Sequence, residues 1–225
     1  MENLLKRSPL EKHKFYLLIF IFLYSGVFVR HALFLFNLEV MLLSDMTVYV
    51  LIPLLIAGAF YATARDRFIE IVAEFKWTSR GLLLFALLGI LYANLSIFCV
   101  RWTEYFTNYY VVQHTDISQL IIVKFGFYGV LYLSISAAIF EELLFKSVLI
   151  RCFKGCPTEL MFVTVSSFLF VVSHYWQGPI SMFFMVLLFA LPTAVYYYRT
   201  KNIINLLLFH FVSDFLIFGG RWARL

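Results

Sequence analysis

Charged side chains are scarce in this 225-residue chain, because Asp, Glu, Lys and Arg make up 14% of it while hydrophobic residues make up 63%. A soluble domain is about one-quarter charged and about half apolar. So few charges cannot cover the surface of a protein in water, and the mean hydropathy is +0.88. A multi-pass helical membrane protein is the class that fits this composition.

Cysteine is also rare, with only three residues, Cys99, Cys152 and Cys156. An odd number argues against a disulfide framework, and Cys152 and Cys156 lack both the zinc-type CxxC spacing and a second pair. We interpret both as ordinary helix-end residues. There is no linker, low-complexity tract or evident internal repeat, so residues 1–225 form one predicted integral membrane domain. The net charge of +5 reflects loop lysines and arginines and predicts no nucleic-acid partner.

Long apolar runs are abundant. A bilayer is crossed by about 20 residues, with a range of about 17–25. Seven spans are predicted: 15–37, 47–64, 81–100, one within 120–153, 160–176, 180–198 and 203–218. We expect an interfacial helix at 65–80 and an outer loop or surface helix at 101–119; an eighth span is an alternative within 31–46 or 101–119. The predicted fold is therefore an all-α polytopic bundle of seven to eight spans.

Lysine and arginine are distributed unevenly between the predicted loops. Of the 18 residues, 13 lie in the segments 1–14, 65–80, 146–154 and 199–201, which all face the same side if the N-terminus is inside. Since basic loops face the cytoplasm, the N-terminus is predicted to be cytoplasmic and, with seven spans, the C-terminus outside. The expected location is a prokaryotic inner or plasma membrane.

Five ionisable residues interrupt the last spans: Glu141, Glu142, His174, His210 and Asp214. With a rise of ~1.5 Å per residue, they lie about 10–21 Å above the cytoplasmic end, near the middle of a ~30 Å hydrocarbon core. His210 and Asp214 are four residues apart and share a helix face. Three helices can therefore direct carboxylates and imidazoles at one buried point.

Each of these residues has a simpler interpretation when taken alone. A lone histidine in a span often makes a helix–helix hydrogen bond, a His-x-x-x-Asp pair can be a structural clasp, and two glutamates can lie at an interface. A proton relay in a carrier and a metal site are functional alternatives. Carriers usually show inverted repeats, which we do not find, and the His-Glu-x-x-His motif is absent. The agreement in depth of three helices favours a common site.

The arrangement resembles the CPBP family of membrane proteases, which includes CAAX prenyl proteases and bacteriocin-processing enzymes. Its Glu-Glu-x-x-x-Arg motif is similar to Glu-Glu-Leu-Leu-Phe-Lys at 141–146. Its Phe-x-x-x-His and His-x-x-x-Asn/Asp motifs match Phe-Val-Val-Ser-His at 170–174 and His-Phe-Val-Ser-Asp at 210–214. The resemblance covers residues 125–218, the last four spans.

One position departs from the family pattern, since Lys146 stands where the family has arginine. Lysine keeps the charge but lacks the planar fork that clamps a carboxylate. Lys146 can serve as a weaker partner for the second glutamate or snorkel to the interface as an anchor. Arg151, about one turn further on, is a candidate to compensate.

The resemblance implies an intramembrane, metal-independent endopeptidase of the glutamate type, with no cofactor. Glu141 would activate water, with its neighbour Glu142 partly neutralised by Lys146 or by protonation; two such carboxyl groups titrate as a coupled pair. His174 would help to position the water. His210 would lie at the oxyanion side with Asp214, whose ionised carboxylate we interpret as the group that orients the His210 ring. By the motif, Phe170 supports the site together with Lys146.

The implied partners are the lipid bilayer and a peptide or membrane-protein substrate. A prenylated CAAX tail, a sorting helix, a pheromone and a bacteriocin leader remain equally open, and the sequence does not indicate an oligomeric state. The alternative function is a non-proteolytic immunity or scaffold protein of the same fold.

Overall fold

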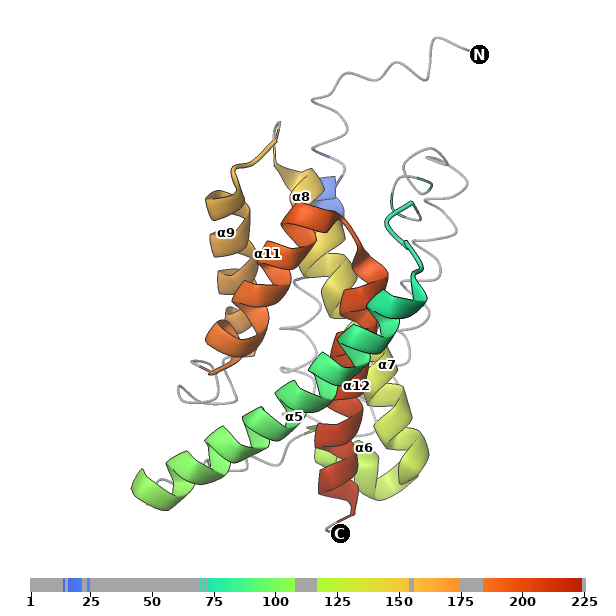
Figure 1. The fold of residues 1–225 in the computed structure, drawn as a ribbon, viewed down its shortest axis with the longest axis vertical. Coiled ribbons are helices and arrows are strands. Elements are labelled where there is room, and N and C mark those ends of the chain that lie inside the picture. The colour runs from blue at the N-terminus through green and yellow to red at the C-terminus, as the bar shows by residue number, and fades with distance from the viewer. Residues whose placement is uncertain are drawn as a thin grey trace.

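The computed structural model describes residues 14, 16–21, 24, 69, 71, 73–107, 117–153, 156–174 and 184–223 (Figure 1). Within these residues the secondary structure is entirely helical, as the composition predicts. The helices are α5 (Ser79–Thr107), α6 (Ile117–Phe125), α7 (Phe127–Glu142), η3 (Leu143–Val148), α8 (Leu149–Cys152), α9 (Glu159–Val172), η5 (Met185–Ala190), α11 (Leu191–Thr200) and α12 (Ile203–Trp222).

Two of these helices are long and apolar enough to cross a membrane: the segment 79–99 of α5 and the segment 203–220 of α12. Both correspond to predicted spans. Helix α5 is longer than predicted, because residues 101–107, expected as an outer loop or a surface helix, continue it. The predicted span 47–64 and most of 15–37 lie outside the described residues, so the total number of spans stays a prediction.

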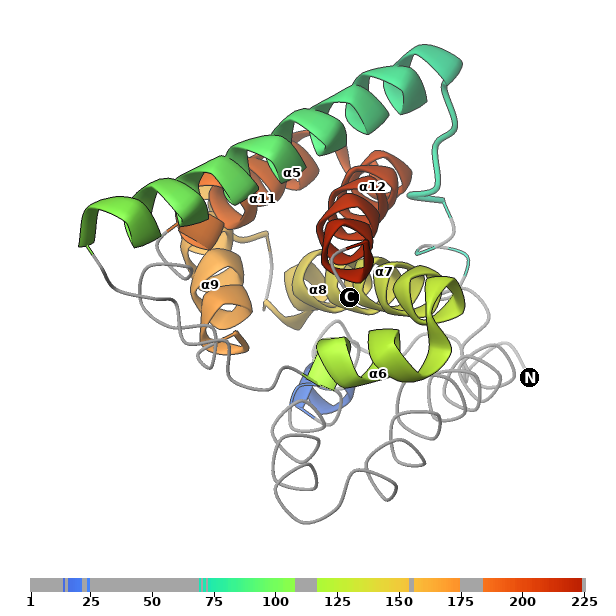
Figure 2. The ribbon, with the colours of Figure 1, turned by 90° about the horizontal axis from the view of Figure 1, so that it is seen from below.

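The region 120–153 departs from a single straight span. Gly126 has a φ of 55°, which breaks the helix between α6 and α7. Helix α6 then lies against α7 (Figure 2), so closely that a side chain on Gly129 would approach the Ile121 carbonyl to 2.7 Å. A continuous run of helix therefore begins after Gly126 and extends through α7, η3 and α8.

The turns of η3 are wider than those of an α-helix. The Leu149 N–H bonds to the Leu144 carbonyl, five residues back, and not to that of Phe145. Such π-helical turns occur frequently at functional sites. Here the widened segment begins directly after the two glutamates.

Helix α9 begins where Thr158 accepts a hydrogen bond from the Met161 N–H at 3.2 Å, a regular N-cap. The helix ends at Val172, earlier than the predicted span 160–176, and Ser173 and His174 form a turn beyond it. His174 is thus held at a helix end and not within a helix.

Helix α12 lies between α5 and α7 (Figure 2) and packs extensively on both. The approach to α5 depends on Gly89, where a side chain would come within 2.8 Å of the Phe209 carbonyl. The Ser213 hydroxyl also points at the Gly89 carbonyl, at 3.4 Å. This close packing fixes the helix that carries His210 and Asp214.

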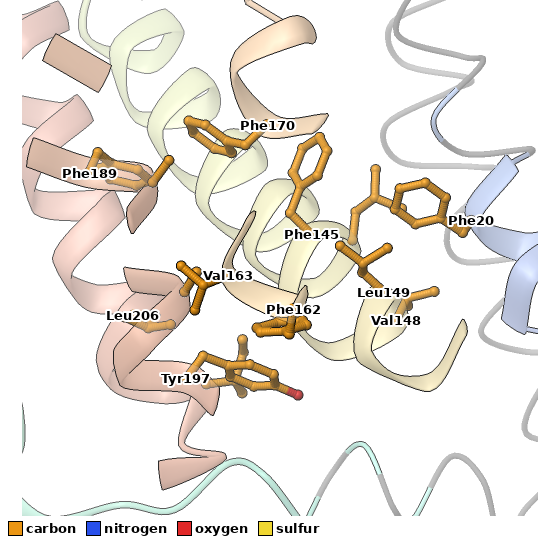
Figure 3. Close-up of a cluster of buried hydrophobic side chains, with 14 of the residues drawn as sticks. Phe20, Phe145, Val148, Leu149, Phe162, Val163, Phe170, Phe189, Tyr197 and Leu206 are labelled. Carbon is orange, nitrogen blue, oxygen red and sulfur yellow. The ribbon is translucent and has the colours of Figure 1, made fainter. Parts of the chain in front are cut away.

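A buried aromatic and aliphatic cluster joins η3, α9, η5, α11 and α12 (Figure 3). Phe145 lies at its centre, edge-on to Phe170 at 5.4 Å between ring centroids. The described part of the first predicted span also packs here, because Phe20 and Tyr24 contact the Phe145 ring edge-on. The core therefore surrounds the helix that follows the two glutamates.

A polar cluster lies at the C-terminal end of η3 and in α8, on the far side from the two glutamates. The buried Glu74 carboxylate binds Arg151 at 2.7 Å and accepts a hydrogen bond from the Tyr197 hydroxyl at 2.9 Å. Arg151 also donates to the Ser147 carbonyl and hydroxyl, at 2.6 and 2.8 Å. We call these four residues the Glu74 cluster. They come from three of the segments predicted to face the cytoplasm or adjoin that side, so those segments meet at one end of the fold.

Candidate active site

Glu141 and Glu142 are the last two residues of α7. The Glu142 side chain is 1% exposed, whereas that of Glu141 is 19% exposed. Consecutive residues of a helix point in different directions, so one carboxylate is enclosed and its neighbour is accessible. The pair is therefore unequal: Glu141 is the more exposed carboxylate, although its Oε2 is buried.

His174 is fixed by the end of α9. Its Nδ1 lies 2.8 Å from the Phe170 carbonyl and 3.1 Å from the Ser173 hydroxyl. Because the Ser173 hydroxyl also points at this carbonyl, at 2.6 Å, the carbonyl acts as the acceptor of both groups. A carbonyl accepts only, so Nδ1 carries a proton, and Nε2 is the ring nitrogen directed away from that carbonyl. That Nε2 faces Glu141 Oε1 at 3.6 Å.

His210 occupies the centre of the site. Its Nδ1 lies 2.8 Å from Glu142 Oε1, and its Nε2 lies 3.4 Å from Asp214 Oδ2 and 3.7 Å from Glu141 Oε2. Three carboxylates thus surround one imidazole. The shortest contact comes from Glu142, while Asp214, which the sequence analysis assigned as the group that orients the ring, lies 3.4 Å from the other ring nitrogen.

The structure brings together all five ionisable residues singled out in the sequence: Glu141, Glu142, His174, His210 and Asp214. We call them the mid-helix cluster. The two oxygens of Glu141 each face one imidazole Nε2, at distances slightly too long for a direct hydrogen bond.

Lys146 does not take the interfacial position considered from the sequence. Its side chain is 0% exposed, so it does not snorkel to the interface. Its Nζ donates to the Ser166 hydroxyl at 3.2 Å and lies 5.6 Å from the centre of the Phe170 ring. Among the described residues it makes no direct ion pair with a carboxylate. Arg151 does not substitute for it, because Arg151 binds Glu74.

Two phenylalanines close the site on its apolar side. Phe170 stacks on Phe189 at 5.2 Å, and its ring lies 4.7 Å from that of His174. Phe189, on the π-helical segment η5, meets the His210 ring edge-on at 4.6 Å. Sequence reasoning found Phe170 through its motif but missed Phe189, which stands in an unbroken apolar run and carries no local signal.

The site combines three carboxylates, two imidazoles and one buried ammonium group. Within the described part of the chain, no group of three or more His, Cys, Asp and Glu side chains has an arrangement suited to a metal ion. The carboxylates and imidazoles of this cluster are groups that can accept and donate protons.

Comparison with known proteins gives one result for this region. Residues 122–216 match the Rce1-like family, described as type II CAAX prenyl endopeptidase Rce1-like. The matched segment contains every residue of the mid-helix cluster and Lys146. No curated protein and no solved structure gives a significant match to the chain.

Proposed function

We propose, from the match of residues 122–216 to the Rce1-like family of type II CAAX prenyl endopeptidases, that the chain is an intramembrane, glutamate-type endopeptidase. Its substrate would be a peptide or a membrane protein. The observation that carries the proposal is the position of Glu141, whose two oxygens face His174 Nε2 at 3.6 Å and His210 Nε2 at 3.7 Å. A partly exposed carboxylate between two imidazoles is suited to activating water.

In the proposed first step, a water molecule binds between Glu141 Oε1 and His174 Nε2. One water oxygen can lie within hydrogen-bonding distance of both atoms, since they are 3.6 Å apart. The Nδ1–H of His174 is directed at the Phe170 carbonyl, so its Nε2 accepts one water hydrogen while Glu141 takes the other. The water oxygen then attacks the substrate carbonyl as its proton passes to Glu141.

His210 would stabilise the oxyanion that forms. Surrounded by three carboxylates, it is the imidazole best suited to carry a proton on both nitrogens. Its Nδ1–H donates to Glu142 Oε1 at 2.8 Å, which leaves the Nε2–H on the side of Glu141 and Asp214. A donor fixed in advance stabilises the developing charge without reorganisation.

In the proposed second step, the intermediate collapses and the carbon–nitrogen bond breaks. The proton held by Glu141 passes to the leaving amine, so water has been divided between the new carboxyl group and the new amino group. Glu141 returns to its starting state, and the reaction consumes nothing but water. Neither a cofactor nor a metal ion is required by this sequence of steps.

The experiment uses the full chain purified in detergent and two fluorogenic peptides with the same C-terminal Cys-aliphatic-aliphatic-X sequence, one farnesylated and one not. We expect cleavage by the native protein and a loss of about 10²–10⁴-fold in Glu141→Gln. Glu159→Gln is the matched control, because Glu159 is an exposed carboxylate that pairs with Arg199. It should cleave like the native protein.

Each other outcome has a defined meaning. If Glu141→Gln cleaves as fast as the native protein, Glu141 is not the base and the proposed mechanism is wrong. If the native protein cleaves neither peptide, and membranes from cells with and without it contain the same peptides, a non-proteolytic scaffold role is favoured. Cleavage of the unprenylated peptide alone would retain the mechanism and remove the prenyl group as a requirement.

A further inference from the structure

The buried Lys146 ammonium is held by a residue that lies outside all three motifs. Ser166, on the neighbouring helix α9, accepts a hydrogen bond from Lys146 Nζ at 3.2 Å, and its own hydroxyl donates to the Phe145 carbonyl at 2.9 Å. An ammonium group can only donate. The single hydroxyl proton of Ser166 is therefore directed to the carbonyl, and the direction of both hydrogen bonds is fixed.

The Phe145 carbonyl is available because η3 is wound as a π-helix. In an α-helix it would accept from the Leu149 N–H, but here that N–H bonds to the Leu144 carbonyl. Buried carbonyls are costly to leave unbonded, and the Ser166 hydroxyl supplies a bond to this one. The widened turn after the glutamates thus creates the acceptor that orients Ser166.

Helix α9 directs one face at the site. Ser166 and Phe170 are four residues apart and share a side of the helix, and His174, in the turn beyond it, lies against the Phe170 ring at 4.7 Å. Phe170 adds a ring face 5.6 Å from the Lys146 ammonium, within the range of a cation–π interaction. The same face therefore holds both the lysine and the histidine that faces Glu141.

Lys146 needs such support because it lacks the fork of an arginine. Burial penalises its charge, and the carboxylates of Glu142, four residues earlier in the sequence, and of Glu141 favour that charge. A flexible ammonium group 0% exposed must be fixed by fitted partners to act on them from a constant position. The planar guanidinium of an arginine would be held by two parallel hydrogen bonds, whereas Lys146 is held by its bond to Ser166.

We propose that Ser166 is a positioning residue of this site, which holds the Lys146 ammonium beside the glutamate pair and so sets the charge felt by Glu141. This inference rests on the proposed function for its effect on cleavage. The contacts also predict an effect on the glutamates that needs no substrate. Both can be measured separately.

The test variant is Ser166→Ala, and Ser167→Ala is the matched control. Ser167 is an adjacent buried serine of α9 whose hydroxyl has no hydrogen-bond partner among the described residues. With the farnesylated peptide we expect Ser166→Ala to lower kcat about 10-fold, with KM unchanged, as for the loss of a hydrogen bond to a charged group. Ser167→Ala should match the native protein. Ser166→Cys conserves volume but bonds weakly, and should behave like Ser166→Ala.

The second readout is labelling of Glu141 and Glu142 by dicyclohexylcarbodiimide, an apolar reagent that reacts with protonated carboxyl groups, followed by mass spectrometry across a pH series. The groups that face the pair are Lys146 on η3, His174 after α9, and His210 and Asp214 on α12. Of these, Ser166→Ala releases only the lysine. We expect labelling to persist to a pH about one unit higher than in Ser167→Ala, because a displaced cation no longer favours the ionised carboxylates.

If Ser166→Ala and Ser166→Cys match Ser167→Ala in both kcat and labelling, the inference is overturned. Failure of the proposed function is distinguishable from this. Retained cleavage by Glu141→Gln would reject the proposed mechanism, while the labelling profile would still decide the role of Ser166.

Discussion

In the Glu74 cluster one carboxylate meets one guanidinium at 2.7 Å and one phenol at 2.9 Å, so that charge and hydrogen bonds are matched. In the mid-helix cluster three carboxylates share two imidazoles at distances from 2.8 to 3.7 Å. Both clusters are buried or half-buried and both involve the helix that runs from α7 to α8. They differ in balance: Glu142 Oε2 has no hydrogen-bond partner among the described residues, whereas both oxygens of Glu74 are bonded.

The difference indicates what each cluster is for. A buried charge with a complete set of partners holds helices together, and removing one partner is costly. A surplus of like charges in a small volume does not stabilise a fold; such groups are typical of sites where protons are moved. We therefore expect changes in the Glu74 cluster to affect unfolding and changes in the mid-helix cluster to affect cleavage.

The largest effect on stability is expected for Arg151→Met. It leaves the buried Glu74 carboxylate without its cation and should reduce the free energy of unfolding by about 3–5 kcal/mol, measured by denaturant unfolding in detergent micelles. Adding Glu74→Gln should restore most of the loss. The control is Arg199→Met, which breaks an exposed ion pair with Glu159 and should cost below about 1 kcal/mol. Equal losses for the two arginines would contradict the distinction.

Next in size is the effect of His210→Gln on cleavage. Loss of the proposed oxyanion donor should lower kcat about 10²–10³-fold with the farnesylated peptide. The variant should unfold at a higher denaturant concentration than Arg151→Met. If cleavage stays within a few-fold of native, His210 does not stabilise the oxyanion.

A smaller effect on unfolding is expected from Tyr197→Phe, which deletes the hydroxyl that donates to Glu74 Oε2. A hydrogen bond to a charged group contributes about 1.5–3 kcal/mol. Tyr198→Phe is the matched control, because the Tyr198 hydroxyl donates to the neutral Pro157 carbonyl at 2.7 Å, a bond worth about 0.5–1.5 kcal/mol. If Tyr198→Phe costs more than Tyr197→Phe, the Glu74 cluster is not the stronger point of attachment.

The smallest effect is expected for Glu142→Gln. The amide keeps the shape and can still bond to His210, while one of three crowded negative charges disappears. The free energy of unfolding of the variant should rise by about 0.5–2 kcal/mol, and cleavage should be slower. Substitutions at active sites commonly trade activity for stability in this way. A loss of stability as large as that of Arg151→Met would mean that the mid-helix cluster is structural.

Much of the helical framework could be predicted from hydropathy, as the predicted spans 81–100 and 203–218 both fall within observed helices. Two features could not. The break at Gly126 lies inside an apolar run and the end of α9 at Val172 falls within the predicted span 160–176, so hydropathy located neither. Hydropathy measures what a lipid-facing segment tolerates, and it does not measure where its helix bends.

The candidate site was also predicted in part from the sequence. The motifs identified the five ionisable residues, because charges are rare in a membrane span and stand out. They did not identify Phe189 or Ser166, since apolar and small residues are common in spans and carry no signal of their own. Nor could they assign partners: Glu142 and not Asp214 binds His210 most closely, and Arg151 binds Glu74.

Composition alone determined that this chain is helical and built for a membrane, because a bilayer requires apolar side chains and internally bonded backbone. The rarity of buried charge determined which residues belong to the site. Tertiary structure decided how those charges are shared, which requires distances between helices far apart in the sequence. The π-helical turn after Glu142, the close approach of α12 to Gly89 of α5 and the face of α9 set those distances, and through them which carboxylate is enclosed and which one is partly exposed.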